Sequence, residues 1–285
     1  MVNPSDSAAE IPEALAEALA RARPRLGGLA STLLYFPSTG STNDIALACS
    51  AKALAERPTP AARGASAERP GGLVVVADEQ TSGRGRRGHT WFSPPGSGLY
   101  VSVVVAPATA RVDPLRATML LTLAAGVALA EGIDAATGLS VSLKWPNDLL
   151  VSRRKLGGIL AEAADRIVVI GYGINVAPAA FPPELRDRAT SLESELGRHV
   201  DRHHVLVETL AALSRRYEDL LDGRFDAILD AWRRRAPGAS GARVTWTTMG
   251  ATHSGITAGI DDRGALLVQV GDRVERIVSG EVVWL

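Results

Sequence analysis

The sequence lacks the features on which several classes of protein depend. A single cysteine, Cys49, stands among 285 residues, which excludes an internal disulfide and a zinc site made of several thiolates. Neither sign of charge is in excess, because 31 lysines and arginines balance 31 aspartates and glutamates, so general attraction to nucleic acid is weak. Aromatic residues make up 5% of the chain, too few to favour rows of rings on which bases stack.

The sequence also has little that points to a membrane or to secretion. Its longest apolar stretch, from Met119 to Ala130, is interrupted by Thr122 and Gly126 and is shorter than the core of a bilayer requires. The first ten residues hold acidic and small side chains instead of the basic start and apolar run of a signal peptide. We therefore expect a cytoplasmic protein without a membrane partner.

What the chain does contain is a mixture of helical and strand patterns up to residue 236. Helices are predicted at 11–20, 45–55, 113–131 and 204–222, and the third is apolar on nearly all sides, which predicts burial. Strands are predicted at 33–36, 73–77, 99–105, 141–145, 149–151, 156–163 and 167–176, the last two as a hairpin. Residues 1–10 and 56–70 are expected to be disordered or mobile.

A change of composition at 237–241, Pro-Gly-Ala-Ser-Gly, marks a predicted domain boundary. Five short strand patterns follow it, separated by turn signals such as Asp261 to Gly264. This spacing predicts a small all-β barrel. The expected division is an N-terminal extension with one helix at 1–30, a mixed α/β domain at 31–238 and a β domain at 239–285.

The first chemical motif is Gly83-Arg84-Gly85-Arg86-Arg87-Gly88. Glycines let successive backbone N–H groups surround an anion, and arginines bind phosphate or carboxylate through two parallel hydrogen bonds. The segment alone supports equally an anionic ligand, such as a nucleotide, and a solvated loop that touches RNA. It is not a Walker A loop, since no Gly-Lys-Ser/Thr follows, and it does not open a helix as a Rossmann loop does.

Two further segments are weak when each is taken alone. In Lys144-Trp145-Pro146-Asn147-Asp148 a lysine ends a buried strand, where its charge needs a partner such as an anionic substrate. The alternative is a turn whose lysine reaches solvent. In 155–162 and 171–175 glycines interrupt strands, which indicates close approach by a ligand or by another backbone, with Gly157 as one candidate. The alternative there is a β-bulge.

In this order the segments resemble the biotin–protein ligases. The resemblance includes Ser41-Thr42-Asn43, the run from Glu79 to Arg86, Trp91, and the segments beginning at Lys144 and Lys155. It extends from about Phe36 to Leu192 and includes the small C-terminal domain. It implies an α+β fold, in which a class II synthetase-like catalytic domain with a mixed sheet and helices precedes an SH3-like β-barrel.

The resemblance also implies an activity and a set of site residues. The family joins biotin to ATP with Mg²⁺, which gives biotinyl-5′-AMP and pyrophosphate, and then transfers biotin to a lysine of a biotin carboxyl carrier protein or domain of acyl-CoA carboxylases. Lys144 and Arg84 are the implied catalytic residues, and no metal ligands are assigned. The implied binding residues for biotin and its adenylate are Ser41, Thr42, Asn43, Gln80, Gly83, Arg84, Gly85, Arg86, Trp91, Lys144, Gly157 and Asn175.

Some expectations depart from that pattern or compete with it. About 35 residues precede the matching segment, too few for a winged helix-turn-helix, so we expect the monofunctional type without DNA binding, with a homodimer as one assembly. His89 and the 56–70 insert depart from the family pattern. A lipoate ligase or octanoyl transferase of the same fold is the nearest alternative, followed by a nucleic-acid-binding module and a partner-binding protein. The loop from Gln80 to Gly98, with Trp91, is expected to order over a bound adenylate.

Overall fold

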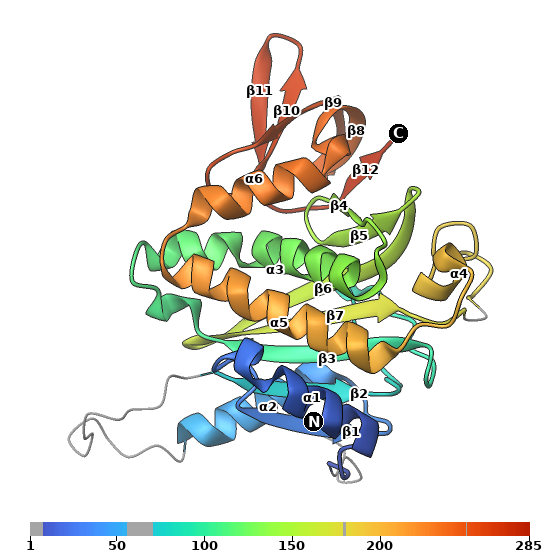
Figure 1. The fold of residues 1–285 in the computed structure, drawn as a ribbon. Coiled ribbons are helices and arrows are strands. Elements are labelled where there is room, and N and C mark those ends of the chain that lie inside the picture. Colours follow the sequence, from blue (N-terminus) through green and yellow to red (C-terminus); the bar gives the residue numbers. More distant parts are fainter. Residues whose placement is uncertain (1–7, 56–70, 179–180, 249) are drawn as a thin grey trace.

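Two β-sheets organise the chain. The computed structural model describes residues 8–55, 71–178, 181–248 and 250–285. A seven-stranded sheet has the order β1-β2-β3-β7-β6-β5-β4, and a five-stranded sheet has the order β11-β10-β9-β8-β12 (Figure 1). Strands β1 and β2 pair in parallel, and from β2 onward the neighbours in the large sheet are antiparallel. The predicted α+β class with a mixed sheet and a small C-terminal β domain is confirmed.

The elements follow the predicted pattern closely. The helices are α1 (Glu13–Leu26), α2 (Thr42–Ala55), α3 (Pro114–Thr137), α4 (Leu192–Leu196), α5 (Arg202–Leu221) and α6 (Phe225–Arg235). The large sheet holds β1 (Thr32–Phe36), β2 (Leu73–Ala77), β3 (Gly98–Val105), β4 (Ser142–Lys144), β5 (Asp148–Val151), β6 (Arg154–Ala164) and β7 (Ile167–Asn175). The small sheet holds β8 (Ser240–Thr248), β9 (Ala251–Ile260), β10 (Leu266–Val270), β11 (Arg273–Ile277) and β12 (Val282–Trp284). The expectations for 1–7 and 56–70 lie outside the described residues. For 8–10 the prediction of disorder was wrong, because the backbone N–H of Ala9 donates to the carbonyl of Tyr35 in β1 at 2.9 Å.

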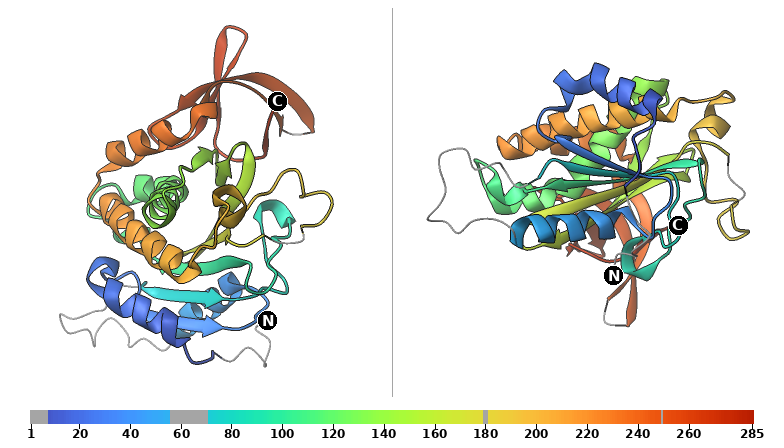
Figure 2. Two further views of the ribbon diagram at one scale, coloured as in Figure 1. Left: turned by 45° about the vertical axis from the view of Figure 1, so that its right-hand side comes forward. Right: turned by 90° about the horizontal axis from the view of Figure 1, so that it is seen from below.

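Helices cover both faces of the large sheet. In β2, Val74 and Val76 pack into a core with α1, α3 and α5, whereas Val75 and Ala77 pack with Ile45 of α2. Successive side chains of a strand point to opposite faces, so a strand covered on both sides reads as a continuous apolar run. Figure 2 shows α2 on the opposite side of the sheet from α1 and α5.

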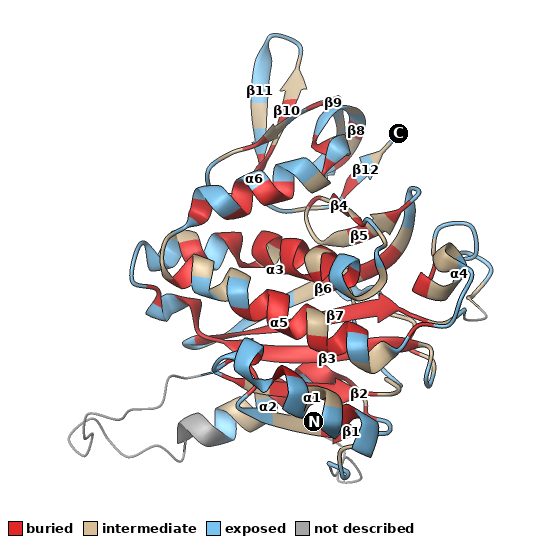
Figure 3. Cartoon of the chain, in the orientation of Figure 1, coloured by how far each residue is buried: buried red, intermediate tan, exposed pale blue. Residues whose placement is uncertain are grey.

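Helix α3 is the central element of the larger core. The side chain of Asp113 accepts a hydrogen bond from the backbone N–H of Arg116, and Gly138 ends the helix at a φ of 76°. By length and composition this helix could cross a membrane, so the prediction that the apolar stretch is too short was wrong. Within the protein, 67% of its most apolar 18-residue stretch is buried, which fits a core helix. Figure 3 shows buried residues along α3.

Several helix boundaries differ from the prediction. Helix α1 continues to Leu26 although its predicted end was residue 20, and α2 begins at Thr42 and not at residue 45. Helix α3 continues past Glu131 because Gly132 lies against α5, where a Cβ atom would come within 2.5 Å of the Thr209 Cα. The amphipathic pattern of 204–222 continues beyond residue 222 in the sequence but forms two helices, α5 and α6. The chain breaks between them because Gly223 adopts a φ of 75°, outside the helical region. The short helix α4 was not predicted.

Side chains from α3 and the β4–β5 turn tie the small sheet to the large one. The indole Nε1 of Trp145 donates to the carbonyl of Gly264 at 3.0 Å. Arg116 Nε donates to the carbonyl of Asp262 at 2.9 Å, and its guanidinium lies over the ring of Phe225. These contacts fix the C-terminal sheet next to β4 and place its last turn at the edge of the pocket described below.

Candidate active site

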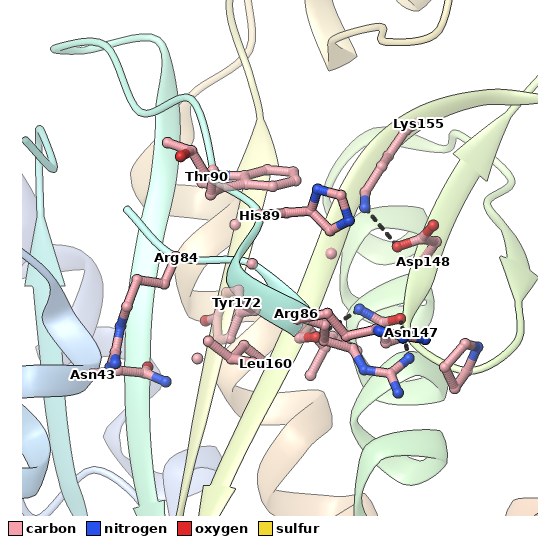
Figure 4. Close-up of a pocket in the computed structure, with 18 of the residues that line it drawn as sticks. Asn43, Arg84, Arg86, His89, Thr90, Asn147, Asp148, Lys155, Leu160 and Tyr172 are labelled. Carbon is pink, nitrogen blue, oxygen red and sulfur yellow. Dashed lines mark hydrogen bonds and ion pairs between the residues drawn. The ribbon is translucent and has the colours of Figure 1, made fainter. Parts of the chain in front are cut away.

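One pocket collects most of the residues that the sequence singled out. Its walls come from the start of α2, the loop between β2 and β3, the β4–β5 turn, strands β6 and β7, and residues 280–282 (Figure 4). The predicted site residues that line it are Ser41, Thr42, Asn43, Gln80, Arg84, Gly85, Arg86, Trp91 and Lys144.

We call Ser41, Thr42, Asn43 and Gln80 the amide side of the pocket. The first three are buried at the start of α2, with exposed fractions of 4%, 3% and 4%. The backbone N–H of Thr42 donates to Gln80 Oε1 at 2.9 Å, and Gln80 Nε2 donates to Ser93 Oγ at 3.1 Å. The first turn of a helix leaves N–H groups without intrahelical partners. Gln80 therefore satisfies one of them and joins its loop to α2.

A carboxylate on β6 organises the residues next to the amide side. Glu162 Oε2 accepts from Asn43 Nδ2 at 2.6 Å and from Arg84 Nη2 at 2.9 Å. Arg84 also pairs with Asp44, at 2.7 Å. Because Arg84 bridges a carboxylate on β6 and one on α2, its guanidinium is held at the pocket. The sequence reasoning placed Arg84 correctly but gave no role to Glu162, which lies eighteen residues beyond the predicted lysine.

Glycines in β6 and β7 form the floor of the pocket. A Cβ atom on Gly171 would lie 2.2 Å from Asn43 Oδ1, and one on Gly173 would lie 2.3 Å from Trp91 Nε1. On Gly158 it would meet Trp91 and Lys155 at about van der Waals distance. The predicted close approach over these strands therefore exists, and the groups that approach are the chain's own Asn43 and Trp91.

Gly157 does not line the pocket. Its Cβ position lies 2.7 Å from the carbonyl oxygen of Gly173, and the β5–β6 register shifts between Leu149 and Leu150, opposite this glycine. At Gly157 the structure therefore shows both features that the sequence offered as alternatives. The backbone of β7 approaches closely, and the pairing of β5 with β6 contains a bulge.

Gly83 and Asn175 also lie outside the pocket lining. A Cβ atom on Gly83 would come within 2.5 Å of the carbonyl of Trp91, so this glycine lets two parts of the loop pack together. Asn175 is buried and donates from Nδ2 to the carbonyl of Thr190 at 2.9 Å. Its amide therefore holds the segment after β7 in place and does not face the pocket as an adenine contact would.

We call Arg86, Lys144 and Lys155 the cation side of the pocket. Lys155 Nζ pairs with Asp148 Oδ1 at 2.6 Å and lies over the ring of Trp91. Figure 4 shows Arg86, Asp148 and Lys155 on one side of the pocket and Asn43 and Arg84 on the other. Lys155 and Asp148 stand within segments that the sequence marked, yet neither was assigned a role in the site.

The environment of the cation side disfavours its own charges. Burial lowers the pKa of Lys144, and the charge of Lys155 lowers it further, while Asp148 and Glu281 oppose the change. Burial likewise lowers the pKa of Arg86, with a contribution from Arg87. Like charges gathered in a half-buried site gain free energy when an anion joins them. The arrangement therefore favours an anionic ligand between these side chains.

The C-terminal sheet contributes to this wall. Residues Gly280, Glu281 and Val282 line the pocket, and Lys144 Nζ lies 5.9 Å from the ring centre of Trp284. Sequence reasoning did not find these residues, because they carry no motif and they reach the pocket through the packing of one sheet on another.

A resident metal site is not formed by the described residues, which hold no cluster of three or more His, Cys, Asp or Glu side chains with suitable geometry. Two carboxylates line the pocket, Asp148 and Glu281, and Asp148 is paired with Lys155. Mg²⁺ in nucleotide sites commonly takes one or two protein carboxylates and completes its shell with phosphates and water. The pocket fits a magnesium ion that arrives with a nucleotide.

Taken together, the fold and the pocket define an enzyme class that binds a small polar ligand beside a cluster of cations, as in the activation of a carboxylate by a nucleotide. Residues 61–176 match the Biotin/lipoate A/B protein ligase family, and residues 239–284 match the Biotin protein ligase C terminal domain. The chain belongs to the biotin protein ligase family.

Individual relatives agree with this assignment. The chain is 36% identical over 228 residues to Biotin--[acetyl-CoA-carboxylase] ligase of Mycobacterium tuberculosis, with 79% of this chain and 83% of the relative covered. It is 40% identical over 220 residues to Bifunctional ligase/repressor BirA of Bacillus subtilis, with 75% of this chain covered. The chain spans 66% of the length of that relative.

A solved structure gives the same result. The biotin protein ligase of Aquifex aeolicus in complex with biotin and ATP superposes with a TM-score of 0.71 and 27% sequence identity, covering 90% of this chain and 99% of that one. The resemblance that the motifs indicated is confirmed.

Proposed function

We propose that this chain is an ATP-dependent biotin–protein ligase. In the first step the biotin carboxylate attacks the α-phosphate of ATP, which forms biotinyl-5′-AMP and releases pyrophosphate. In the second step the ε-amine of a lysine attacks the mixed anhydride, which forms the amide and releases AMP. The names of relatives support a biotin carboxyl carrier protein or domain of acyl-CoA carboxylases as the acceptor.

The observation that carries the proposal is the cation side. A carboxylate and a triphosphate repel each other, so their reaction requires positive charge fixed where the negative charges meet. Lys144 and Lys155 come from different segments of the chain and face the same pocket as Arg86. Burial, and to a smaller extent the charge of Lys155, lowers the pKa of Lys144, and this cost to its charged form is offset when the two anions bind. In this proposal Lys144 and Arg84 are the catalytic cations, and Lys155 joins them.

Magnesium enters with ATP as part of the substrate. It neutralises phosphate charge and helps pyrophosphate to leave. Asp148 and Glu281 are the pocket-lining carboxylates that can reach such an ion. Releasing Asp148 from Lys155 for this purpose would leave the lysine free for the reacting carboxylate.

The amide side suits the polar end of biotin. Asn43, Gln80 and Arg84 are held in place because each donates an N–H hydrogen bond to Glu162 or Ser93, and a small pocket with a few fixed polar groups determines orientation. Trp91 lies across the glycine floor between the two sides, where it can cover the apolar chain of the ligand. A protein that holds both ends of biotin positions the biotin carboxylate for attack on the α-phosphate. The adenylate then stays fixed in the site, so the second step depends on its proximity to the attacking amine.

The loop from Gln80 to Gly98 is proposed to shield the adenylate from water. It carries Arg84, Arg86 and Trp91, and it is bound to α2 through Gln80. Limited proteolysis with and without biotin plus ATP tests this. The loop should become protected when both substrates are present, and equal cleavage would show that it does not close.

ATP–pyrophosphate exchange in the presence of biotin, lipoate, octanoate or no acid tests the activity directly. Exchange with biotin alone is expected, followed by labelling of a carrier domain. Exchange with lipoate or octanoate would move the chain to the lipoate branch of the same family, and no exchange with any acid would overturn the proposal.

The same proposal covers the setting of the enzyme. We infer a cytoplasmic protein, since a free Cys49 suits a reducing compartment. We divide the chain at 30 and 238, with most of the site in the middle part and residues 280–282 of the last part completing one wall. Neutral net charge supports a protein and small-molecule partner over DNA. A homodimer stays a prediction, which sedimentation with and without biotin and ATP measures.

A further inference from the structure

A buried serine on β3 connects the groups of the amide side. Ser102 is 0% exposed and does not line the pocket. Its Oγ lies 2.5 Å from Asn43 Oδ1 and 2.8 Å from Thr42 Oγ1. In the sheet register Ser102 is paired with Gly171 of β7, whose missing side chain leaves the room that Asn43 occupies. Strands β3 and β7 therefore build one seat for the start of α2.

The orientation of the two amides around this serine is fixed by their other partners. Asn43 Nδ2 donates to Glu162 Oε2, a carboxylate held by Arg84, so Asn43 Oδ1 is the atom that faces Ser102. The backbone N–H of Thr42 can only donate, so the Gln80 atom that it meets is the carbonyl Oε1. Both ends of the chain of contacts from Asn43 to Gln80 are thus acceptors.

Counting protons decides what the hydroxyls can do. Three oxygen–oxygen contacts lie in a row, from Asn43 Oδ1 to Ser102 Oγ, on to Thr42 Oγ1 at 2.8 Å, and from there to Gln80 Oε1 at 3.1 Å. The two hydroxyl groups supply two protons for these three contacts. One contact therefore lacks a proton even when both protons stay inside the row, and turning either proton to a ligand would leave a second contact of two oxygens without one.

The consequence falls on Thr42, because of the two hydroxyl-bearing residues in the row it is the one that lines the pocket. Its oxygen can accept a hydrogen bond from a ligand but has no proton to give. A ligand with an N–H or O–H at this point gains a hydrogen bond. A ligand with an oxygen that carries no proton there is repelled, because its lone pairs face those of the Thr42 oxygen. A purely apolar ligand end leaves the buried acceptor without a partner.

We propose that Ser102 is a positioning residue that keeps the Thr42 hydroxyl an obligate acceptor and thereby makes the amide side select a ligand N–H. This rests on the proposed function, in which the ligand is biotin and its ureido ring supplies the N–H. Lipoate and octanoate carry no hydrogen-bond donor at their ring or chain ends. The inference deepens the proposed function because it makes Ser102, which touches no substrate, responsible for the discrimination against them.

Binding measurements by calorimetry test the inference. The probes are biotin and the two carbamate analogues in which oxygen replaces one or the other ureido N–H. The unaltered protein should bind biotin about 100-fold more tightly than the analogue that turns oxygen toward Thr42. In Ser102→Ala the Thr42 proton keeps a single longer contact, to Gln80, and can turn to the ligand. The preference should fall to about ten-fold or less.

The ratio separates positioning from simple loss of structure. A merely damaged pocket would weaken biotin and both analogues by the same factor, so an unchanged ratio in Ser102→Ala overturns the inference. Thr42→Val should remove the preference altogether, and Ser214→Ala, a buried serine of α5, should leave binding and ratio unchanged. Failure of the unaltered protein to bind biotin would overturn the proposed function itself, whereas biotin binding without preference between the analogues overturns this inference alone.

Discussion

The two sides of the pocket are built in opposite ways. On the amide side the polar atoms are buried and paired with one another, as in the row from Asn43 through Ser102 and Thr42 to Gln80. On the cation side positive groups are gathered with fewer partners than charges, and burial lowers the pKa values of Lys144 and Arg86. On one side the hydroxyl protons are committed before a ligand arrives, whereas on the other side the charges are balanced by the ligand.

This difference separates recognition from chemistry. A satisfied network is rigid and gives specificity because a wrong ligand leaves buried groups unpaired. A cluster of like charges is unfavourable until anions join it, and its stabilisation grows as charge develops in the reaction. Substitutions on the amide side should therefore change the KM for biotin, whereas substitutions on the cation side should change kcat.

Removal of Lys144 should give the largest effect and define the cation side. Lys144→Ala should lower kcat for biotin-dependent ATP–pyrophosphate exchange by about 10²–10³-fold, because a fixed charge at the reacting groups is lost. Biotin binding measured separately should change little. Arg166→Ala, an exposed cation at the β6–β7 turn, serves as the control and should keep full activity. Normal turnover of Lys144→Ala would remove this lysine from the mechanism.

Two glycines of the floor offer a matched comparison of the two sides. Gly171→Ala places a Cβ atom on Asn43, whereas Gly158→Ala meets Lys155 and Trp91 at 3.3–3.4 Å. We expect Gly171→Ala to raise the KM for biotin by about 10–100-fold, since displacement of Asn43 breaks its hydrogen bonds with Ser102 and Glu162. Gly158→Ala disturbs Lys155 and Trp91 instead of Asn43, so it should lower kcat more than it changes KM. Its effect should be smaller than that of Gly171→Ala. A larger effect of Gly158→Ala on KM would contradict the division.

The sequence predicted the parts of this pocket that lie within short segments. Thr42 and Asn43 follow Ser41 at a helix start, and the glycine-arginine loop carries Arg84 and Arg86, so adjacent residues stay together in any fold. The groups it missed act across the chain. Glu162 reaches Arg84 and Asn43 from another strand, and Ser102 reads as one polar position within a buried strand. Their roles follow from register, which a single sequence does not specify.

The same reason explains Gly157 and Glu281. A glycine in a strand predicts close approach but not what approaches, and at Gly157 it is the backbone of β7. Glu281 enters the pocket because Trp145 and Arg116 anchor the C-terminal sheet through Gly264 and Asp262. Nothing near Glu281 in the sequence encodes those contacts.

Arg84 lies next to the amide side (Figure 4) but is proposed as a catalytic cation, so its variants test the separation of recognition from chemistry. Arg84→Ala removes a donor to the ligand and leaves Glu162 and Asp44 facing each other uncompensated, so adenylate formation should be abolished or its loss accelerated. Glu162→Gln keeps an acceptor for Asn43 but frees Arg84, and it should raise the KM for biotin by about ten-fold. Single-turnover release of AMP from preformed adenylate measures the retention of the adenylate, and ATP–pyrophosphate exchange at varied biotin concentration measures the KM. Unaltered adenylate retention in Arg84→Ala would assign this arginine to structure alone.

The smallest expected effect is a shift in pH dependence caused by the C-terminal sheet. Burial lowers the pKa of Lys144 and the negative charges of Asp148 and Glu281 raise it, with Asp148 acting more strongly. Lys144 acts as a cation, so activity should fall on the alkaline side as its proton is lost. Glu281→Gln removes one raising charge, so the fall should move to lower pH, by less than in Asp148→Asn. Because Glu281 reaches the pocket from the C-terminal sheet, this shift at unchanged biotin KM would show that sheet acting on the cation side alone. A shift toward higher pH would mean that another group controls the alkaline limb.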